Sequence, residues 1–209
     1  PVYLFPCLPI SPRYMLITIN NQPLQAQQGQ TVLEVARENR ITIPTLCYHK
    51  DLSVVGSCRL CLVEVEGVKI PQASCGLFVR EGMKVQTESD ILTRERKTIL
   101  ELLLTNYGDT DFTADTEFLK WCRLYGATSF PGLSPHKEYA LNSDPNPFVW
   151  VDMNKCILCT RCVRACVEVQ GRFVWRTNER GANTQIVAGL NTTMLEARCE
   201  SCGACVAYC

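Results

Sequence analysis

The sequence contains no long hydrophobic run and no excess of charge of either sign. No stretch approaches the roughly 20 apolar residues that span a membrane, and 21 Lys and Arg balance 21 Asp and Glu. Nucleic acids and anionic membranes are bound through basic surfaces, so the charge balance indicates neither as a partner. The apolar start, residues 1–14, has four prolines and no preceding basic region, unlike a signal peptide. We expect it to be a disordered extension outside the fold, with Cys7 a bystander.

Side chains for acid–base and nucleotide chemistry are also scarce. The sequence has two histidines and neither a G-x-G-x-x-G nor a P-loop motif. Its acidic residues, such as Glu34, occur singly on expected polar faces. We expect His49 to face solvent and His136 to lie in a linker. The sequence therefore predicts no catalytic residue and no nucleotide site in this chain.

Cysteine, by contrast, is abundant and clustered. Fourteen of the 209 residues are cysteines, about 7%, which is below the roughly 8–10% of short disulfide scaffolds. Twelve of them fall in three groups, at 47–75, 156–166 and 199–209. In a chain of this length, C-x-x-C units indicate metal or cluster ligands in a reducing compartment, here the cytoplasm, in preference to disulfides.

The first part of the sequence predicts a small α+β domain over residues 15–90. Strand patterns occur at 15–20, 23–29, 61–67 and 83–87. A helix is expected after the second strand, with a capping box formed by Thr31 and Glu34, so that one helix lies across a sheet.

Residues 91–145 are expected to form a helical spacer and a linker. A first helix with Ser89 or Asp90 as its cap should bury Leu92, Ile99, Leu103 and Leu104. A second helix should end near Gly126, before a stretch rich in Pro, Ser and Asn.

The C-terminal module, residues 146–209, contains one cysteine spacing twice, C-x2-C-x2-C-x3-C. Three thiolates of each run can surround one cubane, while the fourth points away and ligates the other cluster, as in two-cluster bacterial ferredoxins. One predicted [4Fe-4S] cluster takes Cys156, Cys159, Cys162 and Cys209. The other takes Cys166, Cys199, Cys202 and Cys205. Structural zinc is the alternative, although a zinc site has little use for the third thiol.

Four further cysteines in the first domain are predicted to form one more site: Cys47, Cys58, Cys61 and Cys75. Their spacing differs from that of plant-type ferredoxins, and Gly56 suits a loop whose backbone approaches a cluster. Zinc is again the alternative.

The stretch IPTLCYHKDLSVVGSCRLCLVEVEG, with ASC after it, resembles the [2Fe-2S] domain of the large peripheral subunit of respiratory complex I. Related modules begin the NAD-linked formate dehydrogenase large subunit and the NAD-reducing hydrogenase diaphorase subunit. From 146 on, NPFVWVDMNKCILCTRCVRACVEVQGRFVW and EARCESCGACVAYC resemble the two-cluster segment of that formate dehydrogenase subunit. The resemblance implies a β-grasp [2Fe-2S] ferredoxin-like domain, a helical spacer and a two-[4Fe-4S] bacterial-ferredoxin-like domain.

The middle of the sequence departs from this family pattern. The family usually carries His-x3-Cys-x2-Cys-x5-Cys after its LELLL helix, where it binds one more cluster. Here Tyr107 stands near the histidine position, and no cysteine appears before Cys122. We expect that cluster to be absent and Cys122 to be a small buried residue.

The resemblance implies an electron relay between a molybdopterin centre for formate oxidation and a flavin/NAD subunit. The alternatives are a small electron-transfer subunit of an NAD-reducing hydrogenase or diaphorase, a free-standing polyferredoxin, and a zinc-stabilised interaction module. A chain ending on Cys209 would leave a cluster beside a terminal carboxylate. We therefore expect 1–209 to be a fragment of a longer protein.

Overall fold

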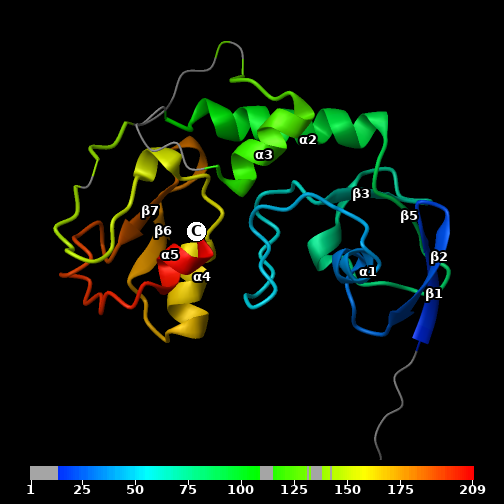
Figure 1. The fold of residues 1–209 in the computed structure, drawn as a ribbon, viewed down its shortest axis with the longest axis horizontal. Coiled ribbons are helices and arrows are strands. Elements are labelled where there is room, and N and C mark those ends of the chain that lie inside the picture. Colours follow the sequence, from blue (N-terminus) through cyan, green and yellow to red (C-terminus); the bar gives the residue numbers. More distant parts are fainter. Residues whose placement is uncertain (1–13, 109–114, 131, 133–137, 142) are drawn as a thin grey trace, which may run out of the picture.

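The computed structural model describes residues 14–108, 115–130, 132, 138–141 and 143–209. The predictions for Cys7, His136 and nearly all of the 1–14 extension lie outside these residues. Figure 1 shows one lobe that contains the larger sheet and a second lobe that contains both C-terminal cysteine runs, with α2 and α3 lying along one side of both. Among the described residues, no helix is both long and apolar enough to cross a membrane.

The first lobe is a sheet with one helix packed on it, as predicted, but the sheet has five strands where four were expected, because the two-residue strand at 72–73 was not predicted. The strands are β1 (Tyr14–Ile19), β2 (Gln22–Gln27), β3 (Leu62–Val65), β4 (Gln72–Ala73) and β5 (Lys84–Gln86). Their order in the sheet is β2-β1-β5-β3-β4, and β1 pairs with β5 in parallel while the other pairs are antiparallel. Side chains alternate between the two faces of a strand, so Ile17 and Ile19 of β1 both point into the core.

Helix α1 (Val32–Glu38) completes this core with one apolar face. Its four buried residues are Val32, Leu33, Val35 and Ala36. They pack with Val63 and Val85 of the sheet, and each large apolar side chain buried in this way stabilises the fold by about 1.5–3 kcal/mol. The short turn η1 (Ser74–Gly76) lies against the same core through Cys75.

The predicted capping box at the start of α1 is confirmed, and its loss has a measurable consequence. The Glu34 amide donates to Thr31 Oγ1 at 3.3 Å, and the Thr31 amide donates to Glu34 Oε2 at 2.7 Å. We expect Thr31→Ala to lower the free energy of unfolding of this lobe by about 1 kcal/mol in a denaturant titration. Thr31→Ser, which keeps the hydroxyl, is the control. Equal destabilisation by both substitutions would contradict a role for the cap.

Helix α2 (Asp90–Thr105) begins at the predicted Ser89, whose hydroxyl accepts from the Leu92 amide at 3.1 Å. The prediction of its buried face was partly wrong, because Ile99, Leu103 and Leu104 are only partly buried. The fully buried positions are Leu92, Arg96, Leu100 and Thr105. The burial of Arg96 was not expected from the sequence, because arginine is rarely buried in a protein core. Arg96 is buried because its guanidinium donates to the Leu62 carbonyl at 2.5 Å and the Tyr125 hydroxyl at 3.1 Å, which compensates for its removal from water.

Helix α3 (Glu117–Tyr125) is capped by Thr116 and ends at Gly126, as predicted. Gly126 has a φ of +58°, the left-handed conformation that a glycine adopts at little cost after a helix. The helix buries Phe118 and Cys122 against Leu100 of α2, and Leu46 and Leu60 of the cysteine-bearing loop join the same cluster. The expected burial of Cys122 is thus confirmed, and this burial raises the pKa of its thiol to about 11.

The second lobe is built from short elements. Helix α4 (Arg161–Arg164) continues into the π-helical turn η3 (Ala165–Val169), and α5 (Ala204–Tyr208) follows the second cysteine run. Strands β6 (Trp175–Asn178) and β7 (Gln185–Ala188) form an antiparallel hairpin. The remaining turns are η2 (Met153–Lys155) and η4 (Gly181–Asn183). The hairpin was not predicted, because β6 has only one apolar residue, Trp175, to mark its inner face.

The two cysteine runs have matching backbones. Leu158 and Thr160 of the first run have φ values of +55° and +59°, and Ser201 and Gly203 of the second have +54° and +76°. These residues occupy equivalent positions in the two runs. A left-handed conformation costs an ordinary residue roughly 1–2 kcal/mol, so its repetition indicates that both loops curl in the same way. The internal repeat of the sequence is therefore also a structural repeat.

Candidate metal centres

The four cysteines of the first lobe lie together at the edge of its core. Cys47 and Cys58 belong to the loop before β3, Cys61 directly precedes that strand, and Cys75 lies in η1. All are buried except Cys58, which is half-buried. The Cys47 amide donates to Cys58 Sγ at 3.5 Å. Ser74 holds η1 in place, because its amide and hydroxyl donate to the Cys61 carbonyl at 3.0 and 2.8 Å.

The electrostatics of these thiols reveal two facing pairs. Hydrogen bonding by Cys58 lowers the pKa of the Cys47 thiol, and hydrogen bonding by Cys75 lowers that of Cys61. The pKa values of Cys58 and Cys75 are raised, since each thiol donates to the partner that ionises first. Two neighbouring pairs of thiols, with three of the four side chains buried, fit a [2Fe-2S] cluster, which takes two thiolates on each iron.

A second group lies in the C-terminal lobe and combines the two runs. Burial raises the pKa of Cys156 to about 11 and also raises that of Cys162, and both are raised further by Cys159 and Cys209. Loss of hydration raises the pKa of the Cys209 thiol, which follows α5, and the negative charge of the nearby Cys159 thiolate raises it further. The fourth thiol of the second run therefore lies within electrostatic reach of the first three thiols of the first run.

A third group surrounds one cavity between η3, β6 and the second run. The four cysteines that line this cavity are Cys166, Cys199, Cys202 and Cys205. Val149, Val174 and Trp175 supply apolar lining. The Ser201 amide donates to Cys199 Sγ at 3.3 Å. Burial raises the pKa of Cys205, while a hydrogen bond from Trp175 lowers it. The fourth thiol of the first run thus lies with the first three of the second run.

The thirteen cysteines of the described ranges are all free thiols. Within those ranges, no three Cys, His, Asp or Glu side chains converge closely enough to hold a single metal ion. In a [4Fe-4S] cluster each thiolate binds a different iron, and in a [2Fe-2S] cluster only two thiolates share an iron. Neither cluster therefore requires three side chains to converge on one metal ion.

Two positions singled out in the sequence have unexpected surroundings. His49 does not simply face solvent, because its ring meets the Tyr208 ring edge-on with centroids 4.6 Å apart. Tyr107, near the family's histidine position, lies with its ring centroid 5.1 Å from that of Phe118 and 4.5 Å from Lys155 Nζ. In residues 106–108 and 115–130, Cys122 is the sole thiol.

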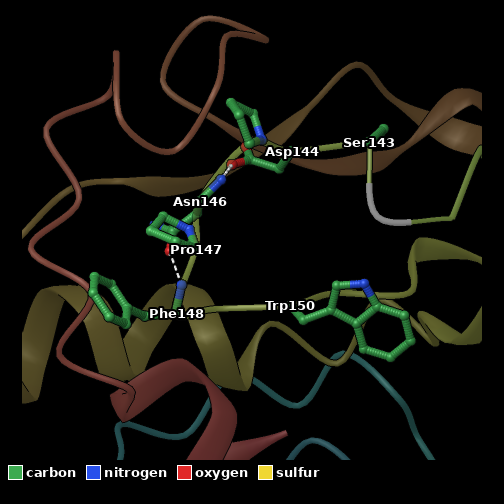
Figure 2. Close-up of a pocket in the computed structure, with 7 residues that line it drawn as sticks. Ser143, Asp144, Asn146, Pro147, Phe148 and Trp150 are labelled. Atoms are coloured by element: carbon green, nitrogen blue, oxygen red, sulfur yellow. Dashed lines mark hydrogen bonds between the residues drawn. The ribbon is translucent and has the colours of Figure 1, made fainter.

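A hollow on the second lobe contains no thiol. It is lined by residues 143–148 and Trp150. Figure 2 shows the hydrogen bonds within this segment, in which the Asn146 amide donates to Asp144 and the Phe148 amide donates to Asn146. Asn146 also donates to Ser201 Oγ at 3.0 Å, and the Met194 amide donates to Asp144 at 2.7 Å. The segment therefore supports the second cysteine run from outside.

Family models match both lobes. Residues 13–90 match a 2Fe-2S iron-sulfur cluster binding domain. Residues 146–197 match the ferredoxin-like domain of NADH-quinone oxidoreductase subunit 3.

Curated relatives and a solved structure extend the likeness over nearly the whole chain. One subunit of an NADH-quinone oxidoreductase of Rhizobium meliloti is 35% identical over 92% of this chain and 23% of its own length. The NADP-reducing hydrogenase subunit HndD of Solidesulfovibrio fructosivorans is 31% identical over 93% of this chain and 35% of its own. A chain in the crystal structure of an NAD+-reducing [NiFe]-hydrogenase in the H2-reduced state has a TM-score of 0.76 and 31% identity, covering 86% of this chain and 77% of that one.

The sheet lobe, the paired cysteine runs and these matches define an iron–sulfur electron-transfer module. The chain belongs to the family of iron–sulfur subunits found in NADH-quinone oxidoreductase-like and NAD-reducing hydrogenase-like enzymes. It spans about a quarter of the length of the first curated relatives that it matches.

Proposed function

We propose that this chain relays single electrons through one [2Fe-2S] and two [4Fe-4S] clusters. The [2Fe-2S] cluster would be held by Cys47, Cys58, Cys61 and Cys75. The first [4Fe-4S] cluster would be held by Cys156, Cys159, Cys162 and Cys209. The second would be held by Cys166, Cys199, Cys202 and Cys205. The observation that carries the proposal is the cavity lined by Cys166 together with three thiols of the other run, which is the crosswise sharing expected of two cubanes.

The clusters supply the one-electron chemistry, and the chain's own residues hold, space and shield them. The proposed units are residues 15–90 for the [2Fe-2S] domain, 91–145 for the spacer and 146–209 for the two-cubane domain. Amides that donate to thiol sulfurs, such as that of Ser201 to Cys199 at 3.3 Å, stabilise the negative charge of a reduced cluster. Free thiols throughout the described residues support work in the reducing cytoplasm.

The relay would connect a catalytic centre with a flavin/NAD subunit. A hydrogenase centre is favoured by the solved chain that resembles this one over 77% of its length. A molybdopterin centre for formate oxidation rests on the sequence resemblance from residue 146 on. A free-standing carrier would need neither.

The test is a reductive titration followed by an assay of the native complex. The reconstituted chain should take up one electron per cluster, about three in all. The native complex, purified by an affinity tag on this chain, should then reduce NAD+ with hydrogen. Reduction by formate alone would assign the molybdopterin centre instead, and purification without any other subunit would favour the free carrier. Absence of electron uptake by the chain would refute the relay itself.

A further inference from the structure

A buried arginine lies between the first lobe and the second. Arg164, the last residue of α4, is 8% exposed. Its guanidinium donates to the Ser53 carbonyl at 2.6 Å, to the Cys47 carbonyl, and to the Cys159 carbonyl at 3.4 Å. One side chain therefore bonds the backbone of a proposed [2Fe-2S] ligand and the backbone of a proposed [4Fe-4S] ligand, which are more than a hundred positions apart in the sequence.

The internal repeat shows that this arginine is not needed to fold a cysteine run. The position equivalent to Arg164 in the second run is Ala207, and the position equivalent to Arg161 is Ala204. Both runs nevertheless have the same backbone conformation at their cluster loops. The two arginines are therefore specific to the run that faces the first lobe.

The charged residues around Arg164 have hydrogen-bond partners of their own. Arg161 donates to the Tyr48 carbonyl at 2.8 Å and to Glu117 at 3.2 Å. Glu168 interacts electrostatically with Arg164, but its carboxylate bonds the Ser53 amide and hydroxyl at 2.7 and 2.5 Å. Among the described residues, the Arg164 Nε has no hydrogen-bond partner. The guanidinium of an arginine is charged at all physiological pH values, and here it lies in a buried site where the effective dielectric constant is low and charges act strongly.

We propose that Arg164 positions the Cys47 loop against the first cubane run and raises the reduction potentials of the two clusters between which it lies. The inference rests on the proposed ligand sets. Reduction adds one negative charge to a cluster, and a buried cation nearby favours the state with the added charge. Arg164 also lies two residues before Cys166, a proposed ligand of the second cubane. We expect a smaller effect on that cluster, because the guanidinium bonds the backbones of Cys47 and Cys159, which belong to the other two ligand sets.

The test compares Arg164→Gln, Arg164→Lys and Arg123→Gln in the chain loaded with iron and sulfide. EPR-monitored redox titration gives the potential of each cluster without any enzyme assay. In Arg164→Gln we expect the equilibrium constant for reduction of the [2Fe-2S] cluster to fall about tenfold, which is about 59 mV for one electron. Arg164→Lys, which keeps the charge, should stay near the wild-type potential. Arg123→Gln removes an exposed charge that pairs with Asp115 and should change nothing.

Three outcomes decide the matter. An unchanged [2Fe-2S] potential in Arg164→Gln with its full iron content would overturn the inference. If Arg164→Gln does not retain its clusters, the Arg164→Lys variant decides. A tenfold fall in the equilibrium constant for reduction of its [2Fe-2S] cluster would show that the charge of Arg164 is not responsible, and would overturn the inference. Absence of cluster signals from the wild-type chain would refute the proposed function instead, so the two failures are distinguishable.

Discussion

Replacing Cys61 with alanine is expected to abolish the rhombic EPR signal of the [2Fe-2S] cluster and to leave both cubane signals in place. Cys61 is 2% exposed and pairs with Cys75 in the first lobe. Its loss removes one of two proposed thiolates from one iron, and no water can readily replace a ligand in so buried a site. The proposed cubane ligand sets share no thiol with that of the [2Fe-2S] cluster. The iron content should fall by about two atoms per chain.

The matched control for Cys61→Ala is Cys122→Ala. Cys122 is also buried, at 5% exposure, and packs among Leu100 and Phe118, but it belongs to none of the three proposed ligand sets. It should keep all three signals and the full iron content. Survival of the rhombic signal in Cys61→Ala would contradict the ligand assignment. Loss of all three signals in that variant would instead point to global unfolding.

The second large effect concerns Cys166, whose loss should damage the cluster held mainly by the other run. Cys166→Ala removes a thiol from the cavity that Cys199, Cys202 and Cys205 also line. The EPR spectrum of the reduced Cys166→Ala chain should therefore match that of Cys202→Ala. It should differ from that of Cys159→Ala, although Cys159 and Cys166 belong to the same run.

This comparison separates crosswise from run-by-run ligation. If each run held its own cluster, Cys166→Ala and Cys159→Ala would instead give the same spectrum. The [2Fe-2S] signal should be unchanged in all three variants and serves as an internal standard.

The larger part of the fold follows from local sequence patterns. Alternation in β1 and the Thr31–Glu34 capping box are local signals, and both are confirmed. The three ligand sets stay a prediction, made from cysteine spacing because that spacing reflects how a loop surrounds a cluster. In the structure, the Cys209 thiol lies near enough to raise the pKa values of Cys156 and Cys162.

What the sequence could not reveal depends on contacts between distant segments. Arg96 has the pattern of a surface residue, and its burial depends on acceptors from Leu62 and Tyr125. Arg164 likewise bonds carbonyls from a loop more than a hundred positions earlier. The partly exposed His49 meets Tyr208 of the other lobe. None of these partners is signalled by spacing or periodicity, because each contact forms only when segments distant in the sequence pack together.

The decisive measurement is that of iron, acid-labile sulfide and zinc in the purified chain. One [2Fe-2S] and two [4Fe-4S] clusters require about ten irons and about ten sulfides per chain, two of each from the first lobe and eight from the second. Zinc without sulfide would contradict the cluster assignment as a whole. A value near fourteen irons would contradict the prediction that the middle segment holds no further cluster.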